Sequence, residues 1–433
     1  MKDEGERMKK SIAKKYKPYP AYVDSGVEWL GEIPEGWDVS QLKRTFLVVN
    51  GSTPSSSESS YWDGDIPWVT PEDLGNLSDA IITATRRYIT QDGYRSCGTT
   101  IVPEGSLILS TRAPIGYLAI AGVSLSTNQG CRSLVFRKAS FNKFFFYEIQ
   151  AAHSELTSLG QGSTFLELSK GHLEDVEISI PSQPEQRIIA IFLDRSTSKI
   201  DALLAKYQKL LVLLAEKRSA LISRAVTKGL DPDAPMKDSG VEWLGEIPEG
   251  WALKKLKLLC KIDTGNKDTI EAVHDGEYPF FVRSQTAERI DSYSFDGEAV
   301  LTAGDGAGVG KVFHYYNGKF DYHQRVYMMH SFSEIDALYF FYFLKEMFSK
   351  VALDGSAKST VDSLRMPVFQ NFYFSFPSKQ DQKRIICYIE EKSAKLDALV
   401  AKVERAVDLL KEYRIALISA AVTGKIDLRE KSA

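Results

Sequence analysis

The sequence predicts an α+β protein built by tandem duplication, in which a mixed α/β globule and a long helix each occur twice. The first observation is a repeat, because residues 24–37 return letter for letter as residues 238–251. The second is a gapless match of residues 181–227 with 377–423, in which 21 of 47 positions are identical. The third is a switch, at about residue 185, from short apolar runs to a heptad spacing typical of long helices.

The N-terminal residues 1–23 form a polar segment that we expect to be frayed. They lack the apolar run of a signal peptide, and no 18-residue apolar stretch occurs in the 433 residues. We therefore expect a cytoplasmic protein that does not cross a membrane. The four cysteines lie far apart, which argues against a zinc site or a disulfide framework and favours structural thiols.

The first globule is expected to span residues 24–180. Clusters of Gly, Pro and Ser such as residues 51–57 separate short apolar runs at 81–82, 106–110, 117–120 and 133–136. Short runs bounded by turn residues suggest strands. Residues 141–158, which include four successive aromatic side chains, favour a helix instead.

The first long helix is placed within residues 181–230. Its heptad seam, interrupted once by Lys217, consists of Ile200, Leu203, Tyr207, Leu210, Leu214 and Leu221. The second copy has Leu396, Leu399, Val403, Ala406, Leu410, Tyr413 and Leu417 in the same phase. We expect the two helices to pair; the alternative is that each stripe packs on its own globule. A helix over residues 196–227 would be roughly 48 Å long, more than the 34–36 Å of one turn of DNA.

The second half of the chain repeats this plan. Gly229 and Pro232 end the first helix, a linker and the second globule occupy residues 231–376, and the second helix and tail occupy residues 377–433. Three short stretches echo between the globules: residues 163–164 and 359–360, 128–132 and 322–325, and 113–116 and 307–310. Both globules are therefore expected to share a fold and to differ in their surface loops.

Charge gives no support for a nucleic-acid partner. The chain has a net charge of −3, residues 38–180 hold 11 basic against 15 acidic side chains, and residues 252–376 hold 14 against 16. If DNA binds here, the fold must gather the basic side chains onto one face.

Motifs that would carry a reaction are missing from the sequence. Residues 304–311 resemble a phosphate-binding loop, but Asp305 stands where a glycine is needed and Val312 replaces the magnesium-binding Ser or Thr. We expect a glycine-rich turn there, one whose backbone could approach a ligand closely. The six histidines lack metal-ligand spacing, and no methyltransferase motif is found. The sequence favours a recognition protein without catalytic residues or a metal of its own.

The repeated motif, read with its surroundings, resembles a known family. Residues 237–251, the preceding 225–232, residues 184–190 and the terminal 421–427 are similar to the specificity (S) subunit of type I restriction-modification systems. The resemblance covers the whole chain in the same order.

This resemblance implies two target-recognition domains joined by helices that pair as an antiparallel coiled coil. Each domain would read one half of a bipartite target in double-stranded DNA, and the helices would fix the spacer. Two modification subunits would dock on the conserved regions and bring S-adenosylmethionine for adenine-N6 methylation. Restriction subunits would add ATP- and Mg-dependent translocation and cleavage. The chain itself would bind no cofactor.

The candidate base-reading residues are polar side chains on the loops whose sequences are similar in the two globules. They are of the types that hydrogen-bond to base edges. In the first domain they are Thr70, Arg112, Asn128, Gln129, Ser163 and Thr164. In the second they are Arg283, Ser284, Gln285, His323, Gln324, Arg325, Lys358, Ser359 and Thr360. The alternative for each is a turn cap or a bond to a neighbouring loop.

The tryptophans receive separate predictions. We expect four tryptophans of the repeated motif, Trp29, Trp37, Trp243 and Trp251, to pack helix ends against the globules. For Trp62 and Trp68 the sequence does not decide between a place in the core and a role as contact residues.

Two other functions remain open at this stage. One is a coiled-coil scaffold with two protein-binding globules and no DNA contact. The other is a single-chain modification-restriction enzyme, which would need the methyltransferase motifs that the sequence lacks.

Overall fold

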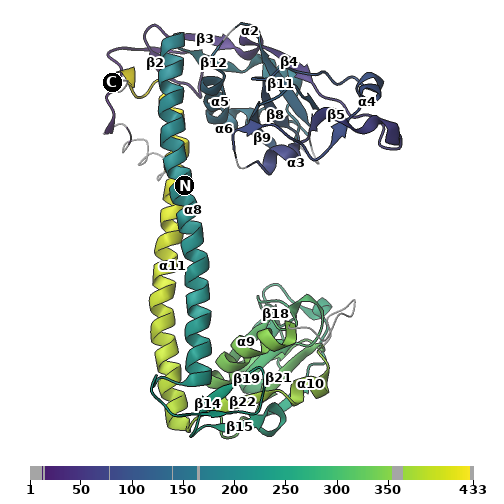
Figure 1. Cartoon of the computed structure of the whole chain (residues 1–433), viewed down its shortest axis with the longest axis vertical. Coiled ribbons are helices and arrows are strands. Elements are labelled where there is room, and N and C mark those ends of the chain that lie inside the picture. Colours follow the sequence, from purple (N-terminus) through teal and green to yellow (C-terminus); the bar gives the residue numbers. More distant parts are fainter. Residues whose placement is uncertain are drawn as a thin grey trace. The chain divides into compact units, whose positions relative to one another are not determined.

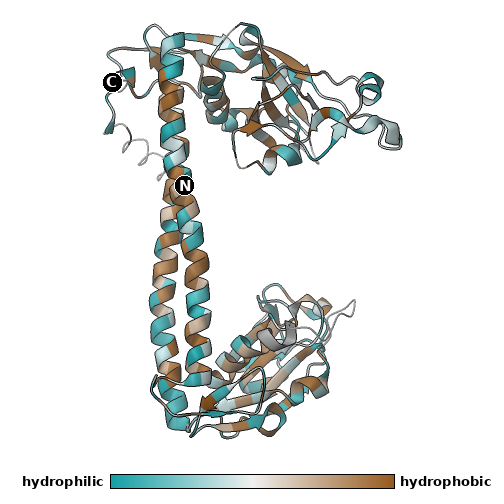
Figure 2. Ribbon diagram, in the orientation of Figure 1, coloured by the Kyte–Doolittle hydropathy of each residue, from teal (hydrophilic) through white to brown (hydrophobic). Residues whose placement is uncertain are grey.

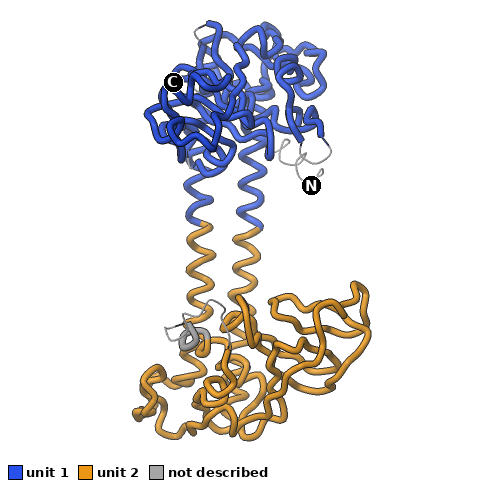
Figure 3. The backbone as a smooth tube through the Cα atoms, turned by 90° about the vertical axis from the view of Figure 1, so that its right-hand side faces the viewer, with its two compact units in different colours: residues 1–206, 405–433 blue, residues 207–404 orange. Residues whose placement is uncertain are grey.

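The computed structural model describes residues 12, 15–77, 79–138, 140–162, 166–353 and 364–429. It divides the chain into two compact units: unit 1 is residues 1–206 with 405–433, and unit 2 is residues 207–404 (Figure 3). Both units contain parts of the two long helices, α8 (Gln183–Lys228) and α11 (Lys379–Val422). The unit boundaries therefore fall inside the helices rather than at their ends.

Unit 1 is a mixed α/β globule (Figure 1). Its strands are β1 (Tyr22–Asp24), β2 (Glu32–Pro34), β3 (Asp38–Gln41), β4 (Phe46–Asn50), β5 (Trp62–Val69), β6 (Ile81–Ile82), β7 (Tyr88–Ile89), β8 (Leu107–Thr111), β9 (Ile115–Ala121), β10 (Ser126–Thr127), β11 (Cys131–Phe136) and β12 (Glu177–Ile180). Its short helices are α2 (Leu42–Thr45), η1 (Ser59–Tyr61), α3 (Pro71–Gly75), α4 (Gln91–Ser96), α5 (Asn142–Ala151), α6 (His153–Ser158) and α7 (Lys170–Asp175).

Unit 2 follows the same plan. Its strands are β13 (Met236–Asp238), β14 (Glu246–Pro248), β15 (Ala252–Lys255), β16 (Lys261–Thr264), β17 (Tyr278–Phe281), β18 (Glu288–Ile290), β19 (Phe295–Ala303), β20 (Phe313–Tyr322), β21 (Val326–His330) and β22 (Tyr373–Phe376). Its shorter helices are η2 (Leu256–Leu258), η3 (Thr269–Glu271), η4 (Gly306–Gly308), α9 (Ala337–Leu353) and α10 (Met366–Gln370).

The main sheets of the two units have one topology. The strand order is β4-β11-β8-β9-β6 in unit 1 and β16-β21-β19-β20-β17-β18 in unit 2. In both, the first four strands pair antiparallel and the fifth joins in parallel, β6 to β9 and β17 to β20. The prediction that the globules share a fold is confirmed, as are the four strands predicted in unit 1.

The fourteen-residue repeat forms the same small hairpin twice, β1–β2 and β13–β14. Each copy packs where the long helix of the other repeat ends. A methyl group on Gly424, after α11, would lie 2.3 Å from Pro34, and one on Gly229, after α8, would lie 3.2 Å from Trp251. The same Ala-Val-Thr sequence stands in the last turn of α8 and across the end of α11, so the same hairpin meets the same sequence at each helix end.

The prediction that the tryptophans of the repeat pack against helix ends is confirmed for Trp37 and for Trp251, which lies beside Gly229 after α8. Trp37 is buried in the core of unit 1, where its Nε1 donates to Glu185 near the start of α8, at 3.4 Å. Trp243 stacks on Phe372 with ring centroids 4.8 Å apart in unit 2.

The long helices run side by side in opposite directions within each unit (Figures 1 and 3). Arg414 pairs with Asp201 at 3.0 Å in unit 1, and Arg218 pairs with Asp397 at 2.6 Å in unit 2. These are equivalent positions, because 414 − 218 and 397 − 201 are both 196. The predicted pairing is therefore confirmed, and each pair joins the Asp of one repeat to the Arg of the other.

The predicted seam is wrong at one position of each copy. Hydrophobic residues recur along both helices (Figure 2), and Ile200, Leu214 and Val403 are buried. Leu203 and its equivalent Leu399, however, remain 37% and 42% exposed. Both lie on the outer surface of the helices, and in unit 1 it is Leu204, one residue after Leu203, that packs against the core.

Both long helices begin earlier than residue 196 and its equivalent. Ser182 donates to Glu185 at 2.7 Å and Ser378 donates to Asp381 at 2.8 Å, a Ser-x-x-acid arrangement at each helix start. The side chains of Gln186 and Gln382 each donate 2.9 Å bonds back to the carbonyl of the proline five residues earlier. These two local bonds fix the start of a 46-residue helix that apolar spacing alone did not reveal.

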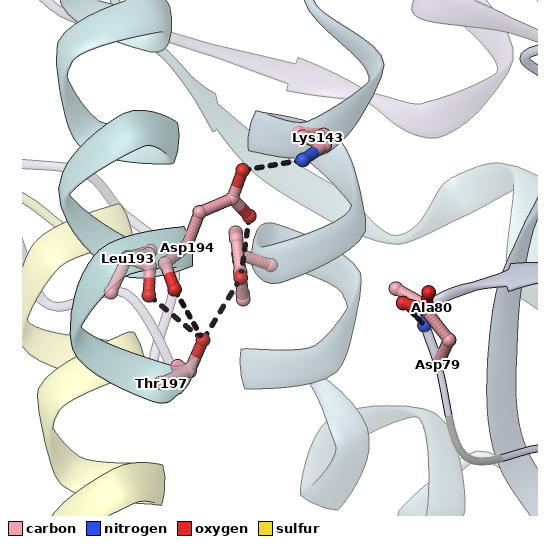
Figure 4. Close-up of polar contacts among 7 residues, drawn as sticks. Asp79, Ala80, Lys143, Leu193, Asp194 and Thr197 are labelled. Atoms are coloured by element: carbon pink, nitrogen blue, oxygen red, sulfur yellow. Dashed lines mark hydrogen bonds and ion pairs between the residues drawn. The ribbon is translucent and has the colours of Figure 1, made fainter. Parts of the chain in front are cut away.

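Side chains fasten the helices to the globules. In unit 1, Lys143 of α5 bonds to Asp194 of α8 at 2.5 Å (Figure 4), and the hydroxyl of Tyr147 of α5 donates to the same carboxylate at 2.9 Å. Ser179 of β12 donates to the carbonyl of Val422, at the end of α11, at 2.8 Å. In unit 2 the hydroxyl of Tyr339 donates to the carbonyl of Val226, the equivalent of Val422, at 2.8 Å.

The expectation that all cysteines are structural fails for Cys387. Cys131 is fully buried, and burial raises the pKa of its thiol far above the usual value, whereas Cys387 is exposed on α11. Over the part of the chain that the structure describes, no helix combines the length and the apolar character needed to span a bilayer.

Candidate nucleic-acid interface

Of the predicted base-reading residues of unit 1, those that the structure describes sit on or beside loops where strand ends are tied together by backbone hydrogen bonds. The amide of Asn128 donates to the carbonyl of Val69 at 2.9 Å, which joins the loop after β10 to the end of β5. The amide of Thr111 donates to Gly130 at 2.8 Å, and the amide of Leu168 donates to Thr111 at 2.9 Å. Three loops are thereby held together at one edge of the sheet.

Unit 2 repeats these three bonds at equivalent places. The amide of His323 donates to Phe281 at 2.9 Å, that of Gly304 to Arg325 at 2.8 Å, and that of Leu364 to Gly304 at 2.9 Å. Leu168 and Leu364 are 196 residues apart, which is the offset of the duplicated helices. We call these three bonds, in each unit, the loop frame.

A fourth loop joins each loop frame through a glycine. A methyl group on Gly51 would lie 1.9 Å from the carbonyl oxygen of Asn128, and one on Gly265 would lie 2.0 Å from that of Tyr322. No side chain fits at such distances, so only glycine lets the two backbones meet. The offset between these glycines is 214, the same as between the copies of the fourteen-residue repeat.

Two predicted glutamines occupy equivalent positions on the loop frames. Gln129 and Gln324 are both exposed. Gln129 accepts a hydrogen bond from Thr53, and Gln324 donates to Asp268 at 3.0 Å. Each glutamine is therefore held by the loop that follows the glycine, so its side chain is positioned before any ligand arrives.

Other equivalent positions carry different chemistry. Arg112 follows Thr111 in unit 1 and lies 3.9 Å from Glu167, whereas Asp305 follows Gly304 in unit 2. Arg325 stands where unit 1 has Gly130. The same backbone framework thus presents a cation in one unit and an anion between cations in the other.

Asp305 bridges two predicted arginines. Arg283 donates to one of its carboxylate oxygens at 3.0 Å and Arg325 to the other at 2.5 Å. The carboxylate is 14% exposed, while the arginine side chains are 43% and 61% exposed. Burial opposes the charge of Asp305, but the hydrogen bonds and charges of Arg325 and Arg283 win and lower its pKa. Asp305 is therefore a stable anion at neutral pH.

Several candidates also hold their own loops. The hydroxyl of Thr70 accepts the amide of Asp73 and caps α3, and the side chain of Asn128 accepts the amide of Gly130 at 2.9 Å. Exposed Ser284 donates to the carbonyl of Thr286, and Gln285 reaches the carbonyl of Phe313 at 3.5 Å. Local bonding does not remove these polar groups from the surface, and their contact with bases stays a prediction.

The prediction that His323 reads a base is wrong, because its side chain is buried and a base-reading side chain has to reach the surface. His323 is 3% exposed, and its Nδ1 accepts the amide of Arg325 at 3.0 Å. Burial, with the nearby Arg283 charge, lowers the pKa of His323, so it serves as a neutral support for the loop. Five further candidates lie outside the described residues: Ser163, Thr164, Lys358, Ser359 and Thr360.

Sequence reasoning missed the loop after the glycine in each unit. Thr53 in unit 1 and Lys267 and Asp268 in unit 2 belong to the same surface as the glutamines. Lys267 lies 2.9 Å from Glu271, within the same short loop. The signal that could have found them was the offset of 214 between Gly51 and Gly265, which marks these loops as equivalent.

Trp62 and Trp68 belong to the core of unit 1. They are 7% and 4% exposed, and their ring N–H groups donate to the carbonyls of Ser55 at 3.0 Å and Ser52 at 2.9 Å. They fix the loop after Gly51 from beneath and are not free to stack on bases.

The glycine-rich stretch is a turn, as predicted, with Gly306 and Gly310 at positive φ. A methyl group on Gly308 would lie 2.8 Å from the carbonyl oxygen of Arg283, so the close approach is made by the neighbouring loop. Within the described ranges, no group of three or more His, Cys, Asp or Glu side chains could hold a metal ion.

Two stretches of the chain match a known protein family. The model described as "Type I restriction modification DNA specificity domain" matches residues 34–211 and 248–404. The chain belongs to this family. The matched stretches contain the loop frames of both units.

Individual relatives carry the same family description in their names. A type I restriction enzyme specificity subunit of Methanocaldococcus jannaschii, MjaIX, is 36% identical over 244 residues, covering 55% of this chain and 54% of that protein. The EcoDI specificity subunit of Escherichia coli is 30% identical over 182 residues, covering 42% of this chain and 40% of that protein. The chain thus spans about half the length of the curated relatives it matches, or less.

A solved structure described as "Structural basis underlying complex assembly and conformational transition of the type I R-M system" shares the fold. It matches with a TM-score of 0.63 and 17% identity, over 90% of this chain and 98% of that one.

Proposed function

We propose that this chain is the DNA sequence-recognition subunit of a type I restriction-modification complex and that each unit reads one half of a bipartite target. The observation that carries the proposal is the loop frame, which recurs bond for bond while the side chains on it differ. Two copies of one reading surface with different chemistry suit a target of two different halves. Family membership supports the same conclusion and does not favour the scaffold without DNA contact.

The acidic balance of the globules is compatible with this function. Lys267, Arg283 and Arg325 stand on the loops of the unit 2 frame, where Glu271 and Asp305 pair with them, so the frame offers hydrogen-bond donors for base edges and not a basic patch. Partner subunits would supply much of the phosphate contact that makes binding strong and salt-dependent.

Paired surface leucines on the long helices support docking of two identical partners. Leu203 and Leu399 are equivalent and exposed, and so are Leu213 and Leu409, at 49% and 43%. Exposed apolar side chains duplicated by the repeat offer the same contact twice. We assign these surfaces to two modification subunits, with the helices setting the spacer between half-sites.

The reactions of the complex are assigned to the partners. Modification subunits would use S-adenosylmethionine to methylate adenine, and restriction subunits would use ATP and Mg for translocation and cleavage. The chain is proposed to be non-catalytic, to bind no cofactor of its own and to act in the cytoplasm.

The direct test maps methylation. The chain is expressed with the modification subunit encoded beside it in a methylation-free host, and every N6-methyladenine in the genomic DNA is located. We expect a split motif of two short specific halves around a fixed gap. A soluble complex that binds S-adenosylmethionine yet methylates nothing would count against DNA recognition.

The docking surfaces have their own test. Leu203→Glu alone and Leu399→Glu alone should each leave a complex with one modification subunit, and the double variant should leave none. Light scattering on the purified complexes measures the stoichiometry, with Val368→Glu, an exposed apolar residue on α10, as the matched control. Two subunits retained by the double variant would refute this placement.

A further inference from the structure

Three loops of unit 2 meet at one carboxylate. Asp305 follows β19, Arg283 follows β17, and Arg325 lies between β20 and β21. The two arginines are 42 residues apart in sequence, yet both donate to the same side chain. We call these residues the arginine pair and its carboxylate.

The arginine pair keeps donors to offer a ligand. Each bond to Asp305 uses the Nη1 group, and a guanidinium carries five N–H donors on three nitrogens. The arginine side chains are also more exposed than the carboxylate that holds them. This geometry fixes the planes of two guanidinium groups while leaving them accessible.

Fixing an arginine in advance favours specific recognition. A free surface arginine loses side-chain entropy when it binds a ligand. An arginine already held by a carboxylate has lost much of that freedom before DNA arrives. A preset plane also suits bidentate recognition, in which two parallel N–H groups must meet two acceptors.

The base that offers two adjacent acceptors in the major groove is guanine, through O6 and N7. Building on the proposed function, we propose that Arg283 and Arg325 read guanine in the half-site of unit 2 and that Asp305 is their positioning residue. Unit 1 has Gly130 at the position of Arg325 and Arg112 at that of Asp305. The arrangement is therefore specific to one half of the target.

The first experiment needs no variant. With the complete complex of chain and modification subunit, binding is measured to the mapped site and to duplexes in which each guanine of the unit 2 half is replaced by 7-deazaguanine, which lacks N7. We expect weaker binding at one or two guanines. A unit 2 half-site without guanine, or one that tolerates every replacement, would overturn the proposal.

The variants then separate reading from support. Arg325→Met should reduce the preference for guanine over adenine at its position by roughly 5- to 150-fold, the range that a good bidentate pair supplies. Asp305→Asn should weaken the same preference, and Asp305→Glu should restore part of it. The matched control is Arg289→Met, which should leave the preference unchanged, since Arg289 is exposed on β18 and donates to the carbonyls of Gly276 and Glu277, away from Asp305.

The outcomes distinguish this proposal from the function on which it rests. A wild-type complex that binds no bipartite site would refute the proposed function itself. A wild-type complex that binds normally, with Arg325→Met weakening all sequences equally, would show phosphate contact and refute guanine reading. Loss of thermal stability in Asp305→Asn with unchanged base preference would show that the carboxylate only joins the loops.

Discussion

Units 1 and 2 fasten the end of a long helix at the same point with different chemistry. In unit 1 the hydroxyl of Ser179 donates to the carbonyl of Val422, and the carboxyl of Glu148 accepts the amide and hydroxyl of Ser179 at 2.7 and 2.9 Å. In unit 2 the hydroxyl of Tyr339 reaches the carbonyl of Val226 directly and that of Ser375 at 3.1 Å.

The difference teaches what duplication preserved. Val226 with Val422, and Ser179 with Ser375, are equivalent residues, and in both units the valine carbonyl at the helix end accepts a hydrogen bond from a side-chain hydroxyl. The side chain that completes the hydrogen bonding differs: it is Glu148 on α5 in unit 1 and Tyr339 on α9 in unit 2. Such a change is tolerated because a buried polar group needs a hydrogen-bond partner, whichever residue supplies it. The loop frames obey the same rule, with their backbone bonds retained and their side chains diverged.

The largest expected effect comes from Glu148, which only unit 1 has at this place. The carboxyl is fully buried, which raises its pKa to about 8, although the bonds from Ser179 oppose the shift. Between the ordinary pKa near 4.5 and 8 the folded state holds a proton that the unfolded chain has lost. Stability from this group is therefore complete below pH 4.5 and falls by up to about 1.4 kcal/mol per pH unit until pH 8.

Glu148→Gln should remove that slope while keeping an acceptor for Ser179. Hydrogen exchange of unit 1 amides, followed from pH 5 to 8.5 and corrected for intrinsic rates, measures the opening free energy. Unit 2 amides report a control region in the same sample. An unchanged slope in the variant would mean that the carboxyl is ionised in the folded protein.

The glycines of the loop frames should be equally intolerant. Gly51→Ala and Gly265→Ala each place a methyl group about 2 Å from a carbonyl oxygen, which forces the backbones apart at a cost of about 3 kcal/mol or more. Hydrogen exchange should show loosening of unit 1 in the first variant and of unit 2 in the second. Gly171→Ala is the control, because nothing lies within 4 Å of its added methyl group. Unequal effects would show that the two frames differ in rigidity.

Much of this architecture was predictable because the two repeats still share long identical stretches of sequence. The equivalent loops that hold Gln129 and Gln324 were found by their echo, and the strands at 107–111 and 115–121 by apolar runs. The arginine pair could be proposed as base-reading but not as a pair, because the bond to Asp305 joins loops distant in sequence.

The failures have a common physical cause. His323 looked like a polar loop residue, yet the backbone bond to Phe281 turns its ring into the interior. Leu203 fitted the heptad, yet its partly buried neighbour Leu204 is the residue that packs against the core of unit 1. Both outcomes depend on tertiary contacts that local sequence does not contain.

A smaller effect is expected at the unit 2 helix end. Tyr339→Phe removes a buried hydroxyl and leaves the carbonyls of Val226 and Ser375 without that donor, which costs about 1–3 kcal/mol. Burial holds the pKa of Tyr339 well above 10, so the loss should be the same from pH 5 to 8.5. Urea unfolding across that range measures it, with Tyr117→Phe at an exposed site as the control. A pH-dependent loss would contradict the contrast with Glu148.

The smallest effects should come from the two equivalent ion pairs between the long helices. Arg414 contacts both carboxylate oxygens of Asp201, at 3.0 and 3.5 Å, whereas Arg218 contacts one oxygen of Asp397 at 2.6 Å. Both pairs are partly exposed, so double-mutant cycles should give coupling energies of about 0.2–1 kcal/mol that shrink in high salt. Since lysine cannot reproduce a two-point contact, Arg414→Lys should lose more of its coupling than Arg218→Lys. Equal losses would mean that the two-point contact adds nothing, and that repeat position alone determines the strength of each pair.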